Sequence, residues 1–207
     1  LFVWMGEILF RTKLSENLFK GLSPWMQKLP GGLIHVNVVG CALFAAISGS
    51  SAATVATVGK MSIPELRKRK YPEKILLGSL AGSGTLGLLI PPSIILIIYG
   101  VTVQESIAKL FIAGIIPGIM IALIFMSYVI IWSLINNKIM PRSYERFSFL
   151  DKIKQSKQLL PVILLILGVI GSIYTGVATA TEAASLGVVG ALILSYFQKS
   201  LNLKTFK

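Results

Sequence analysis

Charged side chains are scarce in this sequence, and acidic ones are the scarcest. Asp, Glu, Lys and Arg make up 14% of the 207 residues, whereas soluble domains contain about 25%. Hydrophobic residues make up 54%. Uncharged runs such as 110–135 and 159–181 exceed the roughly 18 residues that identify a membrane helix. These features exclude a soluble domain.

Several kinds of chemistry lack the residues that they need. The single cysteine, Cys41, excludes an internal disulfide and is expected to be inert, buried packing. The only histidine, His35, precedes Ser48 by three to four helical turns, so nothing marks a catalytic pair, and no enzyme is expected. No Gly-Lys-Ser/Thr follows the glycines of 82–87, which excludes a phosphate-binding loop. No strand-like alternation is present, and the fold class is therefore predicted to be an all-α integral membrane protein.

Positive charge is concentrated between the apolar runs. The formal net charge is +12, but no basic stripe interleaved with aromatic residues occurs, which argues against a nucleic-acid partner. The positive-inside rule instead makes the basic segments cytoplasmic. If segment 33–60 enters and leaves the membrane on one side, 19 of the 20 basic residues are inside and only Lys109 is outside. If 33–60 crosses once, only 15 are inside, so the count favours a re-entrant helical hairpin.

The apolar pattern divides the chain into four parts. The first part, 1–32, is predicted to be the end of a transmembrane helix followed by an interfacial amphipathic helix at 14–29. It is followed by half of a transport domain (33–136), a basic cytoplasmic connector (137–158) and two further transmembrane helices (159–207). Within 33–136 we expect the hairpin at 33–60, a broken helix at 74–100 and a transmembrane helix at 110–136. Because the chain opens inside an apolar segment, we expect a fragment of a longer protein embedded in the lipid bilayer.

Two clusters of small and hydroxyl residues interrupt the apolar runs: "SGSS" at 48–51 and "GSGTLGLLIPPS" at 82–93. Irregular backbone at membrane depth is tolerated only where it is buried in protein or lines a cavity. A single break of this kind is more typical of a kink or a packing face. Two breaks together favour a transporter site, because freed carbonyls can hold a cation such as Na⁺ and freed amides suit a carboxylate.

Each break is expected to contribute both kinds of group. The arm ending at Ile47 offers carbonyls, and the arm starting after Ser51 offers amides. In the second break we expect the free carbonyls at 79–82 and a second half-helix starting at Pro91–Pro92, which places Pro92 and Ser93 beside the substrate. The hydroxyl side chains that could serve as further ligands are Ser48, Ser50, Ser51, Ser83, Thr85 and Ser93.

Three other polar residues lie within apolar segments. His35 and Asn37 are candidate ligands, but hydrogen bonds between helices are the favoured interpretation. Glu182 is the only acid deep in the last apolar region and is a functional candidate for that reason. Because it stands in "TATE", the favoured interpretation is an N-terminal helix cap.

Four blocks, "ISGSSAATVATVG" (47–59), "GSGTLGLLIPPSIILIIYG" (82–100), "SIAKLFIAGIIPG" (106–118) and "TGVATATEAASLGVVGAL" (175–192), carry a family resemblance. Together and in this order, they resemble the large membrane subunit of the tripartite ATP-independent periplasmic (TRAP) transporters. The resemblance covers nearly the whole sequence and matches the first half and middle of that subunit.

The resemblance implies secondary uptake of an organic acid, driven by a sodium gradient across the bacterial inner membrane. It implies two protein partners, a small membrane subunit and a periplasmic solute-binding protein that delivers a carboxylate such as a dicarboxylate or sialic acid. It also implies an elevator-type transport domain with Na⁺ near the hairpin tips. By matching position, the first sodium site would comprise Ser48, Gly49, Ser50, Ser51, Gly82, Ser83, Gly84 and Thr85. Ser50, Ser51 and Thr54 would lie near the substrate; many relatives have Asp where Thr54 stands.

Two alternatives to this function stay open at the level of sequence. One is a stand-alone sodium:anion symporter of similar fold that needs no binding protein. The other is a channel or structural membrane subunit with kinked helices, in which the two breaks would have no role in coupled transport.

Overall fold

The computed structural model describes residues 1–12, 14–141 and 147–197. Their regular secondary structure is entirely helical, with no strand among the described residues, which confirms the all-α prediction. The helices, in chain order, are α1 (Phe2–Phe10), α2 (Leu14–Met26), α3 (Ile34–Ser48), α4 (Ser51–Lys68), α5 (Glu73–Gly84), the 3₁₀-helix η1 (Thr85–Leu88), α6 (Ile94–Val103), α7 (Ile107–Ile135), α8 (Phe149–Ser156), α9 (Leu160–Tyr174) and α10 (Ala180–Phe197). Parts of two predicted segments, 142–146 and 198–207, lie outside the described residues.

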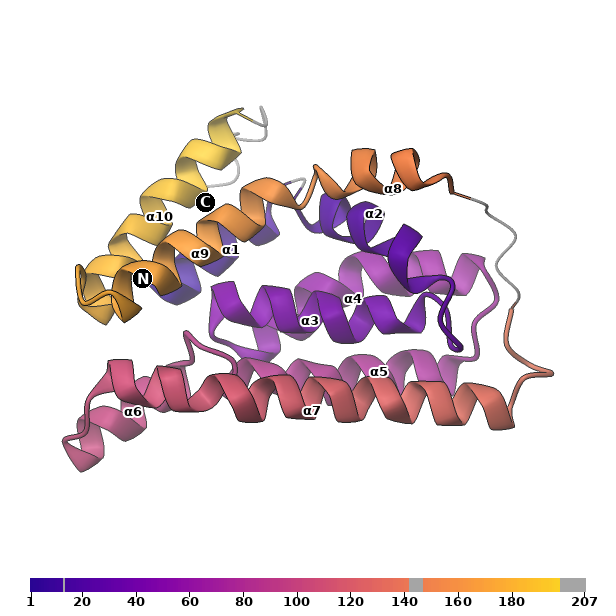
Figure 1. The fold of residues 1–207 in the computed structure, drawn as a ribbon, viewed down its shortest axis with the longest axis horizontal. Helices are drawn as coiled ribbons and strands as arrows, with labels where there is room; N and C mark the ends of the chain where they lie inside the picture. The colour runs from indigo at the N-terminus through magenta and orange to yellow at the C-terminus, as the bar shows by residue number, and fades with distance from the viewer. Residues whose placement is uncertain (13, 142–146, 198–207) are drawn as a thin grey trace.

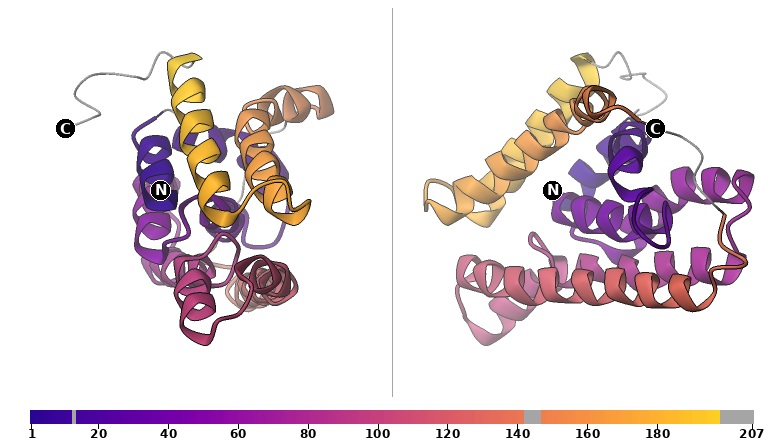
Figure 2. Two further views of the ribbon diagram at one scale, coloured as in Figure 1. Left: turned by 90° about the vertical axis from the view of Figure 1, so that its left-hand side faces the viewer. Right: turned by 45° about the vertical axis from the view of Figure 1, so that its right-hand side comes forward.

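The helices form two groups that meet along α1 and α3 (Figure 1). In one group, α3, α4 and α5 pack side by side with α7 along their flank. In the other, α1, α9 and α10 pack together. The end-on view in Figure 2 shows α9 and α10 on one side of the molecule and α6 and α7 on the opposite side. The groups touch closely at Gly6 of α1, where an added Cβ would lie 2.8 Å from Ser48 Cβ.

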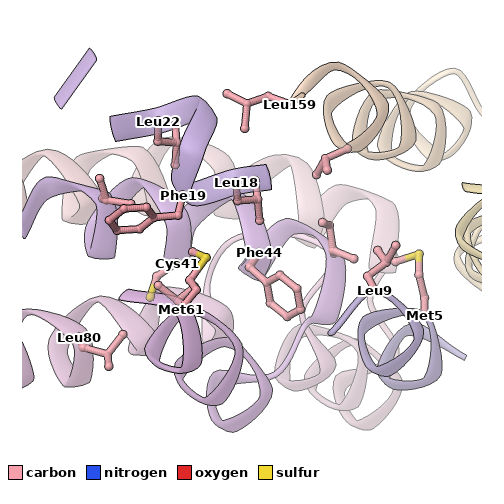
Figure 3. Close-up of a cluster of buried hydrophobic side chains, with 14 of the residues drawn as sticks. Met5, Leu9, Leu18, Phe19, Leu22, Cys41, Phe44, Met61, Leu80 and Leu159 are labelled. Atoms are coloured by element: carbon pink, nitrogen blue, oxygen red, sulfur yellow. The ribbon is translucent and has the colours of Figure 1, made fainter. Parts of the chain in front are cut away.

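The centre of the molecule is α3, which is buried on nearly every side. Apolar side chains therefore occur all round it, as expected for a helix surrounded by others. Figure 3 shows Phe44 and Cys41 of α3 facing residues from α1, α2 and α4. Cys41 is a buried free thiol, as expected from the sequence. The labelled side chains of this cluster are Met5, Leu9, Leu18, Phe19, Leu22, Cys41, Phe44, Met61, Leu80 and Leu159.

α3 and α4 form a helical hairpin whose two arms are joined at Gly49–Ser50. The second arm is longer than expected, because α4 continues past residue 60 to Lys68. Lys60 does not end the helix, since its side chain is exposed and its ammonium lies 4.8 Å from the centre of the Phe10 ring. The 18 residues of α4 measure about 27 Å.

Two of the described helices, α7 and α10, are long and apolar enough to cross a membrane. A third candidate is the pair α8 and α9, which are bent by 51° relative to each other. α7 covers the span predicted at 110–136, and much of its apolar surface is exposed. Its exposed side chains include Ile112, Ile116, Ile119, Leu123, Ile131 and Leu134. Surfaces of this kind suit contact with hydrocarbon rather than with water.

Candidate functional site

The first break is a sharp reversal between α3 and α4. Gly49 ends α3 with φ +60°, in the left-handed region that favours glycine. A side chain at this position would also collide, because an added Cβ would lie 2.5 Å from the Pro92 carbonyl oxygen. Ser50 is extended and caps α4, accepting a hydrogen bond from the Ala53 amide at 3.4 Å. Glycine and serine thus let one helix stop and the next begin within two residues.

The second break lies further along the chain than predicted. The segment 79–82 is still helical, because α5 runs to Gly84 and continues as η1 to Leu88. The Gly82 carbonyl accepts a hydrogen bond from Thr85 Oγ1 at 2.7 Å. The irregular stretch is 89–93, and Pro91–Pro92 precedes the second half-helix instead of starting it. Ser93 is the N-cap of α6, since its hydroxyl oxygen can accept from the Leu96 amide, which a proline side chain cannot do.

The two breaks meet. The Ile94 amide, the first of α6, donates a hydrogen bond to the Gly49 carbonyl at 3.3 Å. Gly87 of η1 lies against the start of α4, where an added Cβ would be 2.9 Å from the Ser51 amide nitrogen. Gly84 packs against Val55, one turn further along α4. The end of α3 and the starts of α4 and α6 therefore lie at one place.

Four hydroxyl groups surround the hairpin tip. Ser48 and Thr54 are fully buried, and their hydroxyl oxygens lie 3.0 Å apart. The Ser50 amide donates to Ser48 Oγ at 3.4 Å. Ser51 Oγ is buried and has no hydrogen-bond partner among the described residues. A buried hydroxyl without a partner is unfavourable, so Ser51 Oγ is the group here that most needs a ligand.

Other predicted ligands have side chains engaged elsewhere. Ser83 is buried against the middle of α3 and donates to the Ser79 carbonyl at 2.6 Å. The exposed Thr85 bonds within its own turn, as noted above. Ser93 donates to the Leu88 carbonyl at 2.6 Å, so its hydroxyl closes the second break. Pro92 is buried beneath Gly49. The structure thus brings Ser48, Gly49, Ser50, Ser51, Thr54 and Gly84 together, but turns the side chains of Ser83, Thr85 and Ser93 away.

Asn37 makes the hydrogen bonds between helices that the sequence analysis favoured, whereas His35 bonds to the turn just before its own helix. The Asn37 side-chain amide donates to the Leu76 carbonyl at 3.2 Å and to Ser79 Oγ at 3.0 Å, which links α3 to α5. His35 Nε2 lies 2.8 Å from the Pro30 carbonyl oxygen. Both residues are fully buried and lie several turns from the hairpin tip.

Glu182 is a helix cap, as favoured from the sequence. Its carboxylate accepts hydrogen bonds from the amide and the hydroxyl of Thr179, each at 2.8 Å. The Glu182 amide donates in return to Thr179 Oγ1 at 3.3 Å. This reciprocal pair is a capping box at the start of α10.

The sequence analysis missed the support that α7 gives to the second break. Gly114 and Gly118 lie against Leu89 and Ile90, and an added Cβ on either would come within 2.9 Å of a heavy atom there. The two glycines are four residues apart and so share one face of α7. Pro117 lies between them in the sequence. The small-residue spacing of Gly114 and Gly118 was the available signal for this contact.

Oxygen atoms dominate the chemistry at the tip. Among the described residues, no group of three or more His, Cys, Asp or Glu side chains could hold a metal. Serine and threonine hydroxyls and helix-end carbonyls are ligands suited to a hard cation of low charge. The amides and the partial positive charge at the start of α4 suit an anion. The hairpin tip therefore combines oxygen atoms of the kind that bind a cation with amides of the kind that bind an anion.

Comparison with known proteins now identifies the family. A family model described as "Tripartite ATP-independent periplasmic transporter, DctM component" matches residues 1–207. The chain belongs to the DctM family of TRAP transporter large permeases. The family and the apolar helices together make it a membrane protein.

Relatives in this family transport different substrates. The chain is 35% identical over 196 residues to the C4-dicarboxylate TRAP transporter large permease protein DctM of Pseudomonas aeruginosa, covering 95% of this chain and 45% of that protein. It is 35% identical over 199 residues to the ectoine/5-hydroxyectoine large permease UehC of Ruegeria pomeroyi, with coverage of 94% and 45%. It is also 35% identical over 207 residues to the sialic acid permease SiaT of Haemophilus influenzae, with coverage of 99% and 33%. The chain thus spans less than half the length of these relatives.

Proposed function

We propose that this chain is part of the large permease subunit of a sodium-coupled secondary transporter in the bacterial inner membrane. The transporter imports an organic acid delivered by a periplasmic solute-binding protein and works together with a small membrane subunit. Membership of the DctM family supports this proposal. The observation that carries the mechanism is the hydrogen bond between the Ile94 amide and the Gly49 carbonyl, because it brings the two helix breaks together.

In this proposal, Na⁺ binds at the hairpin tip, with backbone carbonyls and serine hydroxyls as ligands. The protein side of the site is Ser48, Gly49, Ser50 and Ser51, with 82–85 as the facing wall. The buried Ser51 Oγ, which has no described partner, supports this placement. The last carbonyls of a helix lack amide partners within it, so the end of α3 supplies further oxygen ligands.

The carboxylate of the substrate binds beside this cation, at the start of α4. Ser50, Ser51 and Thr54 lie on the first turn or cap of that helix, where amides and the helix dipole favour negative charge. Pro92 and Ser93 form the opposite wall, because the Pro92 carbonyl lies against Gly49 and the amide of Ile94, the residue after Ser93, bonds to the Gly49 carbonyl. The relatives named above carry C4-dicarboxylates, ectoine or sialic acid, and each of these molecules contains a carboxylate.

Transport then requires the site to face each side of the membrane in turn. We propose that the hairpin 33–68 is re-entrant and that the group α3–α7 moves against α1, α9 and α10 as an elevator. Each positive charge that enters with the potential gains about 2.3 kcal/mol per 100 mV. Coupled binding of Na⁺ and the anion therefore drives uptake without ATP.

The test is uptake by the full-length permease with its small subunit and binding protein in proteoliposomes. We expect C4-dicarboxylate or sialic acid uptake to require an inward Na⁺ gradient. We also expect Ser51→Ala to weaken the apparent Na⁺ affinity on the order of tenfold, because it removes one oxygen ligand. The matched control is Ser62→Ala, which removes another buried hydroxyl of α4 about 16 Å away along the helix. Uptake that persists unchanged without Na⁺ would refute the coupling.

The same preparation separates this proposal from a stand-alone symporter. The family assignment supports the tripartite form. We expect no uptake when the solute-binding protein is omitted, and full uptake of free substrate under that condition would favour the stand-alone form.

A further inference from the structure

α8 carries an apolar stripe that no described residue covers. Phe149, Leu150 and Ile153 are 67%, 76% and 41% exposed. Ile153 lies four residues after Phe149 and three after Leu150. These spacings place side chains on one side of a helix, so the three form one surface. The site proposed for transport does not use this surface, because α8 lies beside α2 and away from the hairpin tip (Figure 1).

Contacts with α2 determine which side of α8 is exposed. Trp25 Nε1 donates a hydrogen bond to Ser156 Oγ at 2.8 Å. The Lys152 ammonium lies 5.2 Å from the centre of the Trp25 ring, and Lys152 is buried. Gly21 of α2 packs against Leu159, where an added Cβ would lie 2.5 Å from Leu159 Cγ. Lys152 and Ser156 therefore face α2, and the apolar stripe faces outward.

Positive charges border the stripe. Lys154 and Lys157 are exposed. By helical spacing, Lys157 falls beside Leu150 and Ile153, and Lys154 falls beyond Leu150. The one acid of the helix, Asp151, lies on the far side and accepts from the Ser148 amide at 3.1 Å. An apolar stripe edged by lysines is typical of a helix that lies on an anionic membrane surface.

The neighbouring segments place α8 at the end of a membrane segment. α9 begins four residues after α8 ends, and the chain turns by 51° between the two helices. The Trp25 indole, 43% exposed, stands beside α8, and tryptophan is enriched at membrane–water interfaces. Lysine side chains at such an interface can extend their ammonium groups to the headgroup phosphates.

We propose that α8 lies on the bilayer surface and binds anionic phospholipids, with Lys154 and Lys157 contacting the headgroup phosphates and the apolar stripe contacting the acyl chains. The cation–π contact of Lys152 with Trp25 holds the helix in the orientation that presents both. The charge complementarity of the two exposed lysines selects anionic lipid over zwitterionic lipid.

The first test measures lipid retention by the full-length protein with native mass spectrometry. The probes are phosphatidylglycerol and phosphatidylcholine with identical acyl chains. We expect the wild-type protein to prefer phosphatidylglycerol and Lys154→Gln/Lys157→Gln to weaken that binding on the order of tenfold. The control, Lys68→Gln/Lys74→Gln, removes the same charge from exposed positions of α4 and α5 and is expected to retain the preference. An unchanged preference in the first variant, or an equal loss in both, would overturn the proposal.

The second test asks what covers the apolar stripe. A fluorescent label on Leu150→Cys, in full-length protein reconstituted in phosphatidylglycerol vesicles, is expected to be quenched by lipids brominated in their acyl chains. The same label on Lys68→Cys is expected to be quenched much less. A label at 150 that brominated lipid does not quench would show that protein, and not lipid, covers the stripe, and the proposal would then be wrong.

Discussion

The starts of α4 and α6 meet at one site but differ in which groups satisfy their hydrogen-bond donors and acceptors. The α6 start is closed by protein, because the Ile94 amide bonds to the Gly49 carbonyl and Ser93 both caps the helix and bonds to the Leu88 carbonyl. The α4 start also has a serine cap, Ser50, but the next hydroxyl, Ser51 Oγ, is buried without a described partner. In the proposed transport site, α6 therefore holds the hairpin tip in place, and α4 is the helix start whose Ser51 hydroxyl is left for a ligand.

The largest expected effect follows from separating the two starts sterically. Gly49→Ala would place a methyl group 2.5 Å from the Pro92 carbonyl oxygen and force an alanine to φ +60°. The left-handed conformation alone destabilises by roughly 1–2 kcal/mol, and the collision adds to that. We expect uptake in proteoliposomes to fall to background and the thermal unfolding midpoint to drop.

The control for this change is Gly78→Ala, because an added Cβ at Gly78 meets no atom within 4 Å. We expect near-normal uptake from it, together with a small gain in stability from the better helix propensity of alanine. If Gly49→Ala transports normally, close contact between the breaks is not needed.

A second change targets the hydrogen bond between the breaks. Ile94→Pro eliminates the donor to Gly49, while proline is well tolerated at the first position of a helix. Ser93 already has the extended backbone that precedes proline, so α6 should still start in place. We expect uptake to fall several-fold, because the net contribution of such a bond is about 1 kcal/mol. Ile94→Val keeps the amide and is expected to retain uptake. Equal uptake rates for Ile94→Pro and Ile94→Val would show that the hydrogen bond has no role.

The third test compares the two serine caps directly. Ser50→Ala and Ser93→Ala remove the same group from the starts of α4 and α6, and each should lower stability by about 1 kcal/mol. We expect the apparent Na⁺ affinity to weaken further in Ser50→Ala than in Ser93→Ala at matched stability. The measurement is the Na⁺ dependence of uptake alongside thermal unfolding, and identical Na⁺ curves would remove the distinction between the two starts.

The smallest effect is expected at a third helix start, that of α10. Glu182 closes this start with Thr179, far along the chain from either break. Glu182→Gln retains an acceptor but loses the charge, so we expect a loss of about 0.5–1 kcal/mol in the free energy of unfolding. Uptake at saturating substrate should be unchanged, and a large loss of uptake would show that the acid has a transport role beyond capping.

Much of the local structure could be predicted from the sequence because it depends on local rules. Apolar runs without charge predicted the long helix α7, and the "TATE" spacing predicted the cap at Glu182. The first break was located at its residues, since Gly49 and Ser50 are a left-handed residue and a cap within two positions. The end of α4 was misplaced, because a lysine on an exposed face does not interrupt a helix.

At the second break, local sequence preferences did not predict the structure. Gly82, Ser83 and Gly84 are poor helix formers, yet the helix continues through them because the small residues pack against their neighbours. Ser83 points to α3 and Ser79, so its hydroxyl is used within the helix packing. Nothing in the spacing of these residues says which neighbour each one faces.

The sequence alone determined that the chain is helical, that it lies in a membrane and that two of its apolar segments are interrupted, because hydrophobicity and backbone preference are properties of short segments. Only the tertiary structure decided that the two interruptions meet and that the Gly49 carbonyl bonds to the Ile94 amide. It also decided that Ser51 Oγ has no partner among the described residues, while the hydroxyls of Ser83 and Ser93 are engaged. These facts depend on how helices distant in sequence pack against one another, and packing is a property of the whole chain.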